Sequence, residues 1–343
     1  MKRLIIMISA VVAVAGGCSS FGQQKQMTET EYEEMVVRII LNDIMNNKAD
    51  KKADSEIIIT NETDGEIVIT TEAEGKIEFS IVGITNETID WGDGSEIEKT
   101  YQEMILDKGY FNRNHYYYKS IYRHEYSNAN AHTITIKGKY ITQFNCDCSN
   151  ITSLDVSKCI SLTNLECNFC ELTSLDVSKN TALISLSCGR NQLTSLDVSK
   201  NRALINLSCS HNKLTNLDLS NNTALANLSC ELNELKSLDV SKNTALKDLN
   251  CSLNQLTNLD ISKNTALESL RCNGNSLTSL DVSQNTELYS LDCFDNQLSA
   301  EALNAIFSAL QRSDRKKYLD IKRNPGTATC DKSIAEEKGW RIE

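Results

Sequence analysis

Thirteen cysteines carry the most reactive side chains of this 343-residue chain, and eight of them follow a fixed spacing. The eight recur every 21 residues: Cys146, Cys167, Cys188, Cys209, Cys230, Cys251, Cys272 and Cys293. Thiols in one column of stacked coils lie about 5 Å apart and parallel, an arrangement that rarely satisfies the torsion angle of a disulfide and cannot surround a zinc ion. We predict a ladder of buried free thiols that pack as small apolar groups, with disulfides between coils as the alternative.

Other residue types offer little catalytic chemistry. The four histidines (His115, His124, His132 and His211) share no ligand spacing, and neither a nucleophile paired with a base nor a glycine-rich phosphate loop is evident. We therefore expect no enzyme, no cofactor and no metal. An aspartate row also recurs with the 21-residue period: Asp155, Asp176, Asp197, Asp218, Asp239, Asp260 and Asp281. Lysines three residues after most of these aspartates form an adjacent positive row. We therefore favour a structural surface with compensated charges, with cation binding by the aspartates as the alternative.

A short sequence motif repeats with the cysteines, for example Leu183-x-x-Leu186-x-Cys188-x-x-Asn191-x-Leu193. A fixed period of this size indicates a solenoid whose coils bury their apolar faces by stacking. An asparagine at the bend can bond backbone groups that the turn leaves unpaired, which predicts a structural ladder of Asn191, Asn212, Asn233, Asn254, Asn275 and Asn296.

This motif resembles the core of the leucine-rich-repeat family, in its bacterial 21-residue class. The second half of each unit, Leu193-x-x-Leu196-x-Val198-x-x-Asn201, is nearly a copy of the first. The resemblance implies an α/β-solenoid with mainly parallel β structure, a right-handed superhelix over residues 141–298 with a parallel strand in each half of every coil.

The two halves of the units differ in variability. The second half is nearly uniform, whereas the first half keeps its leucines and cysteine but changes its outward positions. Varied chemistry on one sheet is typical of recognition of an irregular partner, and outward apolar or aromatic residues are common interface anchors. We predict a ligand-binding variable face that includes Phe169, Arg190, His211, Leu232, Leu253, Arg271 and Phe294. Neutral drift at solvated positions is the alternative.

The N-terminal residues form a targeting pattern. Lys2 and Arg3 precede the uncharged run of residues 4–14, which is too short to span a bilayer, and small residues follow before Cys18. Residues 1–17 are expected to be a signal peptide. Cys18 resembles the acylated cysteine of bacterial lipoproteins, although Ala15 stands where that family has Leu or Val; an ordinary secretory signal is the alternative. The net charge of −11 argues against nucleic acid as a partner, because binding it depends on neutralising phosphates with Lys and Arg.

Residues 18–54 are expected to be a lipidated tether with a short helix over residues 28–45. Residues 55–140 then alternate with period two, as half-buried strands do, for example at Ile77, Phe79 and Ile81. The turn at residues 90–94, Asp-Trp-Gly-Asp-Gly, suits a hairpin. Together with His124-x-Tyr126 it resembles the PKD-type modules of bacterial surface proteins, which implies an immunoglobulin-like β-sandwich; the Tyr-rich segment 100–122 looks like an insertion.

The open end of a solenoid needs a cover, and residues 299–343 are expected to form a C-terminal cap. Leu303, Ile306, Phe307 and Leu310 fit one side of a helix. The pattern as a whole predicts a monomeric lipoprotein of the cell envelope, displayed at the outer membrane or cell surface, that binds a protein or glycan partner in the manner of an adhesin. The alternative is a passive structural or assembly component of the envelope without an outside ligand.

Overall fold

The computed structural model describes residues 64–71, 75–83, 88–95, 99–107, 115–128, 130–147, 150–312 and 317–343. These ranges belong to one compact unit, Thr60–Glu343. The expected signal peptide, Cys18, the tether with its helix at residues 28–45, and Cys148 lie outside the described residues. No helix among the described residues is long and apolar enough to cross a membrane.

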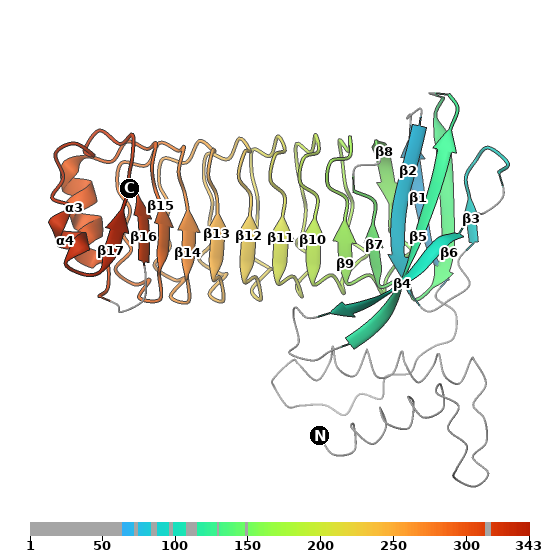
Figure 1. Cartoon of the computed structure of the whole chain (residues 1–343), viewed down its shortest axis with the longest axis horizontal. Helices are drawn as coiled ribbons and strands as arrows, with labels where there is room; N and C mark the ends of the chain where they lie inside the picture. The colour runs from blue at the N-terminus through green and yellow to red at the C-terminus, as the bar shows by residue number, and fades with distance from the viewer. Residues whose placement is uncertain are drawn as a thin grey trace, which may run out of the picture. The chain divides into compact units, whose positions relative to one another are not determined.

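The repeats form a β-solenoid in which each 21-residue coil contributes one short strand (Figure 1). The strands are β9 (Asn164–Glu166), β10 (Ser185–Ser187), β11 (Asn206–Ser208), β12 (Asn227–Ser229), β13 (Asp248–Asn250), β14 (Ser269–Arg271) and β15 (Ser290–Asp292). Each pairs in parallel with the strand exactly one repeat away, for example Leu186 with Leu207. The parallel, leucine-rich-repeat type of solenoid predicted from the sequence is confirmed.

The core of each coil consists of the repeated apolar residues. In the coil of β10 these include Leu183, Leu186, Cys188, Leu193 and Val198, all buried and all members of one continuous hydrophobic cluster. Burial stabilises each such side chain by about 1.5–3 kcal/mol relative to exposure. All eight cysteines of the 21-residue series are buried and free, which confirms the predicted ladder of free thiols, here called the thiol ladder.

The second half of the coils differs from the prediction, because from the coil of β9 onward no strand forms there in any described coil, and in the first coil the strand that does form, Ile151–Asp155, pairs antiparallel with residues 68–71 of the preceding sheet. Asp197 explains the difference locally: its Oδ1 accepts the backbone N–H of Ser199 at 2.8 Å. This side-chain bond closes a turn and competes with ladder formation. The same Asp–Ser turn recurs in the other coils, for example at Asp218 and Ser220. The expectation of a parallel strand in the second half is therefore wrong.

Two sheets begin before the repeats and reach the two halves of the first coil, at residues 143–145 and 151–155. Their strands are β1 (Asp64–Thr71), β2 (Gly75–Val82), β3 (Thr88–Asp90), β4 (Lys99–Asp107), β5 (His115–Tyr126), β6 (His132–Lys139), β7 (Gln143–Asn145) and β8 (Ile151–Asp155). One sheet has the order β3-β6-β1-β8, and the other begins β4-β5-β2-β7. The alternating residues Ile67, Ile69, Ile77 and Phe79 are buried, so the strands predicted there are confirmed. The Tyr-rich segment forms most of an antiparallel β4–β5 hairpin.

Both of these sheets connect to the solenoid. Strand β7 pairs antiparallel with β2 on one side and parallel with β9 on the other, so one sheet runs from β4 through all the repeat strands. Strand β8 pairs antiparallel with β1. Phe144 of β7 packs against Phe79 of β2, with 5.9 Å between ring centroids. The N-terminal sheets thus cover the first coil, as an open solenoid end requires.

The turn at residues 90–95 is held by side-chain bonds. Asp90 Oδ1 accepts the N–H of Gly92 at 2.9 Å, and Asp93 Oδ1 accepts the N–H of Ser95 at 2.9 Å. His124 Nε2 lies 2.7 Å from Asp93 Oδ2 and its ring stacks on buried Trp91. Gly92 has φ +76°, and a Cβ there would lie 2.5 Å from the Thr133 carbonyl oxygen, so the turn requires glycine.

Asp93 makes this turn a source of acid sensitivity. The Ser95 hydroxyl, followed by the Ser95 N–H and His124, lowers the pKa of Asp93 from 3.8 to about 2. A carboxyl group whose pKa is lower in the folded than in the unfolded state stabilises the fold at every pH above the unfolded pKa. This contribution is lost as the pH falls from the unfolded pKa toward the folded pKa of about 2. Asp93→Asn is expected to lower the melting temperature at pH 7 but much less at pH 2. Thermal unfolding at pH 7, 4 and 2 tests this, and an equal loss at all three values would contradict it.

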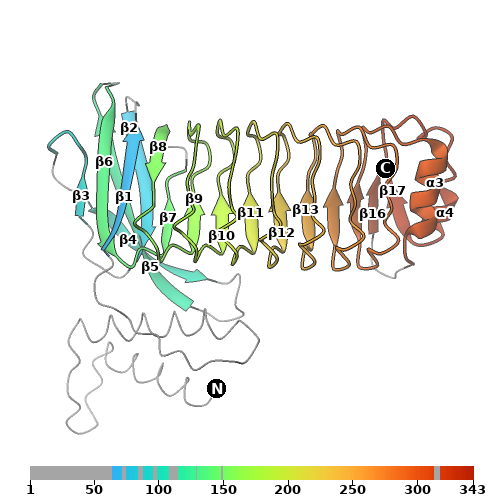
Figure 2. The same cartoon turned by 180° about the vertical axis from the view of Figure 1, so that it is seen from behind.

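The C-terminal residues cap the last repeat coil (Figure 2). Helix α3 (Ala300–Ala309) begins after Ser299, whose side chain accepts from Ala302 N, and buries Leu303, Ile306 and Phe307 as predicted. Strand β16 (Lys317–Asp320) continues the parallel sheet, followed by α4 (Ser333–Glu336) and β17 (Trp340–Ile342). Trp340 is buried. The final strand was not predicted, because three residues carry too little periodicity.

Candidate binding surface

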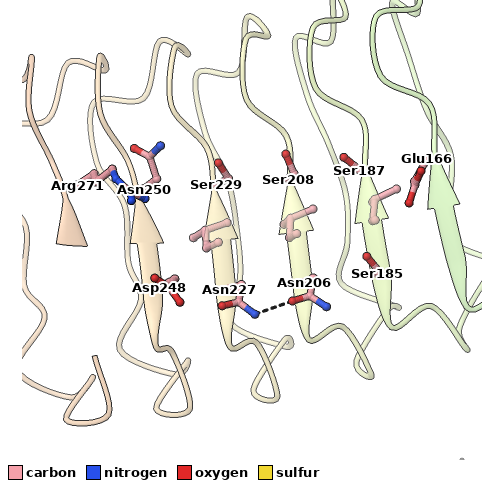
Figure 3. A pocket seen from close by; sticks show the side chains of 13 residues that line it. Glu166, Ser185, Ser187, Asn206, Ser208, Asn227, Ser229, Asp248, Asn250 and Arg271 are labelled. Atoms are coloured by element: carbon pink, nitrogen blue, oxygen red, sulfur yellow. Dashed lines mark hydrogen bonds between the residues drawn. The ribbon is translucent and has the colours of Figure 1, made fainter. Parts of the chain in front are cut away.

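The repeat strands present two outward rows of side chains, here called the strand face. The middle residue of each strand is a buried leucine, so the first and last residues lie on the opposite side from the core, where all but Ser269 are at least partly exposed. The first-residue row is Asn164, Ser185, Asn206, Asn227, Asp248 and Ser269, and the last-residue row is Glu166, Ser187, Ser208, Ser229, Asn250 and Arg271. Figure 3 shows most of these side chains standing side by side on neighbouring strands.

A shallow groove of about 350 Å³ runs over the strand face from β9 to β14. Small neutral side chains line its middle, among them Ser187, Ser208 and Asn227. The charged residues of the lining lie toward its ends, Glu166 at one end and Asp248 and Arg271 at the other. The groove therefore offers hydroxyl and amide groups, flanked by opposite charges.

A third row of side chains, here called the turn row, borders the strand face at the bend that follows each strand. It consists of Phe169, Arg190, His211, Leu232, Leu253, Gly274, Asp295 and Arg323, all with φ between +53° and +66°. Phe169, Leu253 and Leu232 are 52%, 43% and 36% exposed. Arg190 stacks over the Phe169 ring at 5.0 Å. The turn row thus holds large apolar side chains in solvent.

The backbone of the turn row favours other residue types. A left-handed backbone costs a residue with a Cβ roughly 1–2 kcal/mol, and glycine, asparagine or aspartate adopt it most readily. Gly274 and Asp295 occupy this position in two coils with the same backbone. The fold therefore does not require Phe169, Leu232 or Leu253, and strained residues of this kind concentrate at functional sites.

A pair of substitutions measures this strain. Leu232→Gly is expected to give a protein about 1 kcal/mol more stable to denaturant than Leu232→Ala, because only glycine adopts the left-handed backbone without steric cost. The two variants remove the same exposed side chain, so their difference isolates the backbone term. Denaturant unfolding of both proteins is the measurement. A Leu232→Ala variant that equals or exceeds Leu232→Gly in stability would show that this position is unstrained.

The seven residues predicted for the variable face do not form one row. Five of them belong to the turn row, namely Phe169, Arg190, His211, Leu232 and Leu253. Arg271 ends β14 on the strand face, and Phe294 is half-buried beneath Arg323, with 5.7 Å between the guanidinium carbon and the ring centroid. The prediction missed the first-residue row of the strand face, including Asn206 and Asn227, although alternation around the buried leucine was a signal for it.

The predicted asparagines form the outer asparagine ladder at the bend. Asn212 is representative: its Nδ2 donates to the carbonyl oxygens of Cys188 at 3.0 Å and Cys209 at 3.1 Å. Its Oδ1 accepts the N–H of Leu193 at 2.9 Å. The ladder therefore satisfies buried backbone groups of two adjacent coils and fixes the bend that carries the turn row.

An inner asparagine ladder, not predicted, lies in the second half of the coils: Asn180, Asn201, Asn222, Asn243, Asn264 and Asn285. Nδ2 of Asn222 donates to the carbonyl oxygens of Val198 at 3.0 Å and Asn201 at 2.9 Å. Its Oδ1 is buried without a hydrogen-bond partner among the described residues. The near-identity of the two halves of the repeat was the sequence signal for this ladder.

The aspartate row lies outside the binding surface. Each aspartate closes the turn described above, and the pKa of Asp197, for example, is lowered first by the Ser199 N–H and then by the Ser199 hydroxyl. Cys167 and Cys170 form a Cys-x-x-Cys pair, but Cys170 Sγ donates to the Cys146 carbonyl oxygen at 3.4 Å. No group of three or more potential metal ligands occurs among the described residues.

Charged residues occupy the strand face beyond β14. Asp292 of β15 pairs in register with Asp320 of β16. Arg271 Nε lies 3.6 Å from Asp292, and Lys322 Nζ lies 3.6 Å from Asp320. Burial raises the pKa of Asp292, an effect that Arg271 partly offsets. The ion pairs separate this acidic end from the neutral middle of the groove.

Comparison with known proteins gives structural neighbours only. No family model matches the chain, and no curated protein matches it. The functional domain of InlJ from Listeria monocytogenes, which includes a cysteine ladder, is 34% identical with TM-score 0.47; the match covers 62% of this chain and 50% of that domain. Internalin C2 of the same organism is 20% identical with TM-score 0.45, covering 46% and 74%. Internalin F is 18% identical with TM-score 0.31, covering 59% and 86%.

The chain therefore spans half the length of the InlJ domain that it matches. Its class follows from its own geometry: the 21-residue parallel coils define a leucine-rich-repeat solenoid preceded by antiparallel sheet. Its structural neighbours include Listeria internalins.

Proposed function

We propose that this protein is an exported lipoprotein of the cell envelope that binds a protein or glycan partner outside the cell. The strand face and the turn row together form the binding surface. Export and anchoring rest on the sequence of residues 1–17 and on Cys18, and the adhesin-like role rests on the varied side chains of the strand face and the turn row. The proposal includes a monomeric chain without catalytic activity.

The observation that carries the proposal is the turn row. Phe169, Leu232 and Leu253 stand exposed on a strained backbone that glycine or aspartate would adopt more easily. Core packing does not explain them, because they lie outside the buried hydrophobic cluster and remain 36–52% exposed. Exposed aromatic and aliphatic side chains beside a groove are suitable anchors for a partner, since their burial on binding supplies affinity.

The N-terminal sheets are proposed to be a PKD-like spacer over residues 55–140, between a tether at residues 18–54 and the solenoid at 141–298. The Asp93–His124 turn supports the PKD-like part of the proposal. The continuous hydrogen bonding through β7 joins this module directly to the first coil. We propose that it presents the binding surface in a fixed direction relative to its own sheets.

A second candidate is a passive envelope component whose solenoid packs against another protein of the same membrane. The uniform second half of the coils favours it, because repeated exposed residues such as Asp197 and Lys200 suit a structural contact. This candidate places the repeats where external reagents cannot reach them.

Protease shaving of intact cells that express the protein distinguishes the two candidates. Mass spectrometry of the released peptides is expected to find sequences from residues 146–298, with a known periplasmic or cytoplasmic protein absent as the lysis control. Complete protection of these residues, in cells whose lysates contain the protein, would contradict outward display and favour the passive component.

A further inference from the structure

We infer that the ligand of the strand face is an uncharged, extended β-1,4-linked glycan that lies across the strands. This inference rests on the proposed function and names the ligand class of the same surface. It depends on four properties of the groove: its length, its charge, its period and its hydrogen-bonding groups.

The groove has the dimensions of an extended chain. It crosses the six strands β9–β14, which corresponds to about 24 Å at the usual spacing between neighbouring strands. Its volume of about 350 Å³ is spread along that length. A compact small molecule would leave most of such a groove empty, whereas a linear polymer would contact every coil.

The middle of the groove favours an uncharged ligand. Over the three coils of β10, β11 and β12 the outward strand residues are serine and asparagine only. The charged lining residues Glu166, Asp248 and Arg271 lie beyond these coils. The strand residues of these middle coils therefore offer no complementary charge to a polyanion or a polycation and offer hydrogen-bonding partners to neutral hydroxyl groups, while the charged Arg190 and Glu231 lie at the bends that border the strands.

The period of the surface distinguishes a glycan from a peptide. Equivalent side chains recur once per coil, about every 4.8 Å, whereas an extended peptide advances about 3.3 Å per residue. A peptide laid across the strands therefore loses register after one or two coils. In a β-1,4-linked glycan each equatorially linked pyranose ring advances the chain by a distance close to one strand spacing. Successive rings are turned by about half a turn, so every ring lies over one coil and every second ring presents the same edge to the equivalent groups two coils away.

The serine hydroxyls provide the matching hydrogen bonds. Ser187 donates to Asn168 Oδ1 at 2.9 Å and Ser229 donates to Glu231 Oε2 at 2.5 Å. The hydroxyl oxygens of Ser187 and Ser229 keep lone pairs that can accept a hydrogen bond from a sugar hydroxyl. Ser208 lies between them on β11. On the neighbouring row Asn227 Nδ2 donates to Asn206 Oδ1 at 2.6 Å, which fixes the two amides side by side (Figure 3).

Apolar groups border the polar floor. The half-buried Ile184 and Ile205 immediately precede β10 and β11, and Leu232 and Leu253 of the turn row lie beyond the ends of β12 and β13. Pyranose rings carry C–H groups as well as hydroxyls. A polar floor with apolar margins therefore matches both kinds of group on the ligand.

The test measures binding of the full mature chain to neutral β-1,4-linked oligosaccharides of glucose, N-acetylglucosamine and mannose by calorimetry. At least one hexasaccharide is expected to bind, and about tenfold more tightly than its trisaccharide, because six coils line the groove. Ser208→Leu, which removes the central hydroxyl and fills the groove, is expected to weaken binding about tenfold or more. Thr215→Leu, at an exposed position of the second half of the same coil, is the matched control and should bind as the wild type does.

The inference is overturned if none of these hexasaccharides binds, if an acidic glycan binds better than every neutral one, or if Ser208→Leu and Thr215→Leu bind equally. Capture of a protein partner at Leu232 without glycan binding would overturn the glycan and leave the proposed function intact. The absence of both kinds of ligand would count against the two proposals together.

Discussion

In reducing buffer, the free energy of unfolding is expected to fall steeply as the pH rises above 9. Burial raises the pKa of the thiols of Cys188, Cys251 and Cys293 from 9.0 to about 12. In the unfolded chain these thiols ionise near pH 9, while in the folded chain they remain protonated. A group whose pKa is raised on folding contributes its full stability below the unfolded pKa and loses it toward the folded pKa, so the window here is pH 9–12.

The size of this effect comes from the number of stacked thiols. Each buried thiol that ionises only on unfolding lowers the free energy of unfolding by about 1.4 kcal/mol per pH unit in that window. Eight thiols occupy the thiol ladder, so the combined slope is on the order of 10 kcal/mol per pH unit if the coils unfold together. We therefore expect unfolding without denaturant within about two units of pH 9.

Urea unfolding at pH 8, 9, 9.5 and 10 measures the slope. Cys230→Ala should reduce it by about 1.4 kcal/mol per pH unit, because one titrating thiol is removed. Val198→Ala is the control: it removes a buried side chain and should lower stability equally at every pH. A free energy of unfolding that is unchanged between pH 8 and pH 10 would contradict the buried, protonated state of the ladder.

Asn212→Ala is expected to be the most destabilising single change on the binding-surface side of the coil. It removes the donors to the Cys188 and Cys209 carbonyl oxygens and the acceptor of the Leu193 N–H. Only the Leu193 N–H is left unpaired, at a cost of about 1–3 kcal/mol, because the two carbonyl oxygens keep bonds from Asn191 and Asn233. The two lost hydrogen bonds add about 0.5–1.5 kcal/mol each, so a total loss of about 2–5 kcal/mol is expected. Urea unfolding at pH 7 is the measurement.

Two further asparagines provide matched comparisons. Asn216→Ala removes an exposed asparagine of the same repeat and should change stability by less than about 0.5 kcal/mol. Asn222→Ala, in the inner asparagine ladder, should cost less than Asn212→Ala, because the Asn222 Oδ1 has no partner to lose. Equal effects of Asn212→Ala and Asn216→Ala would contradict the role of the outer ladder.

The sequence was sufficient to predict the parts of the fold that repeat. The 21-residue spacing of Cys188 and its equivalents predicted both the parallel coils and the thiol ladder, because each coil buries the same positions. The cap helix was predictable for a similar reason, since Leu303, Ile306 and Phe307 mark one helical face. These patterns are local, and packing reinforces them.

The features that were not predicted depend on geometry that the pattern does not encode. The Leu-x-x-Leu-x-Val motif of the second half suits a strand and a turn equally. Residues 151–155 form strand β8 where β1 lies beside them to pair, whereas the later coils, such as that of Asp197 and Ser199, have no such neighbour among the described residues and form the turn alone. The left-handed backbone at Leu232 is contrary to the preference of leucine; only Gly274 and Asp295 in the same column indicated it. The pairing of β7 with β2 joins segments about 60 residues apart, as with Thr142 and Val82.

Site-specific photo-crosslinking in living cells tests the central claim most directly, namely that the strand face and turn row form the binding surface. A photoreactive residue placed at Leu232 is expected to yield a defined crosslinked species that is absent without irradiation. The same residue at Ser237, exposed in the second half of the same coil, should yield none. Crosslinking from Ser237 and not from Leu232 would contradict the account and assign the uniform side of the solenoid as the surface that meets a partner.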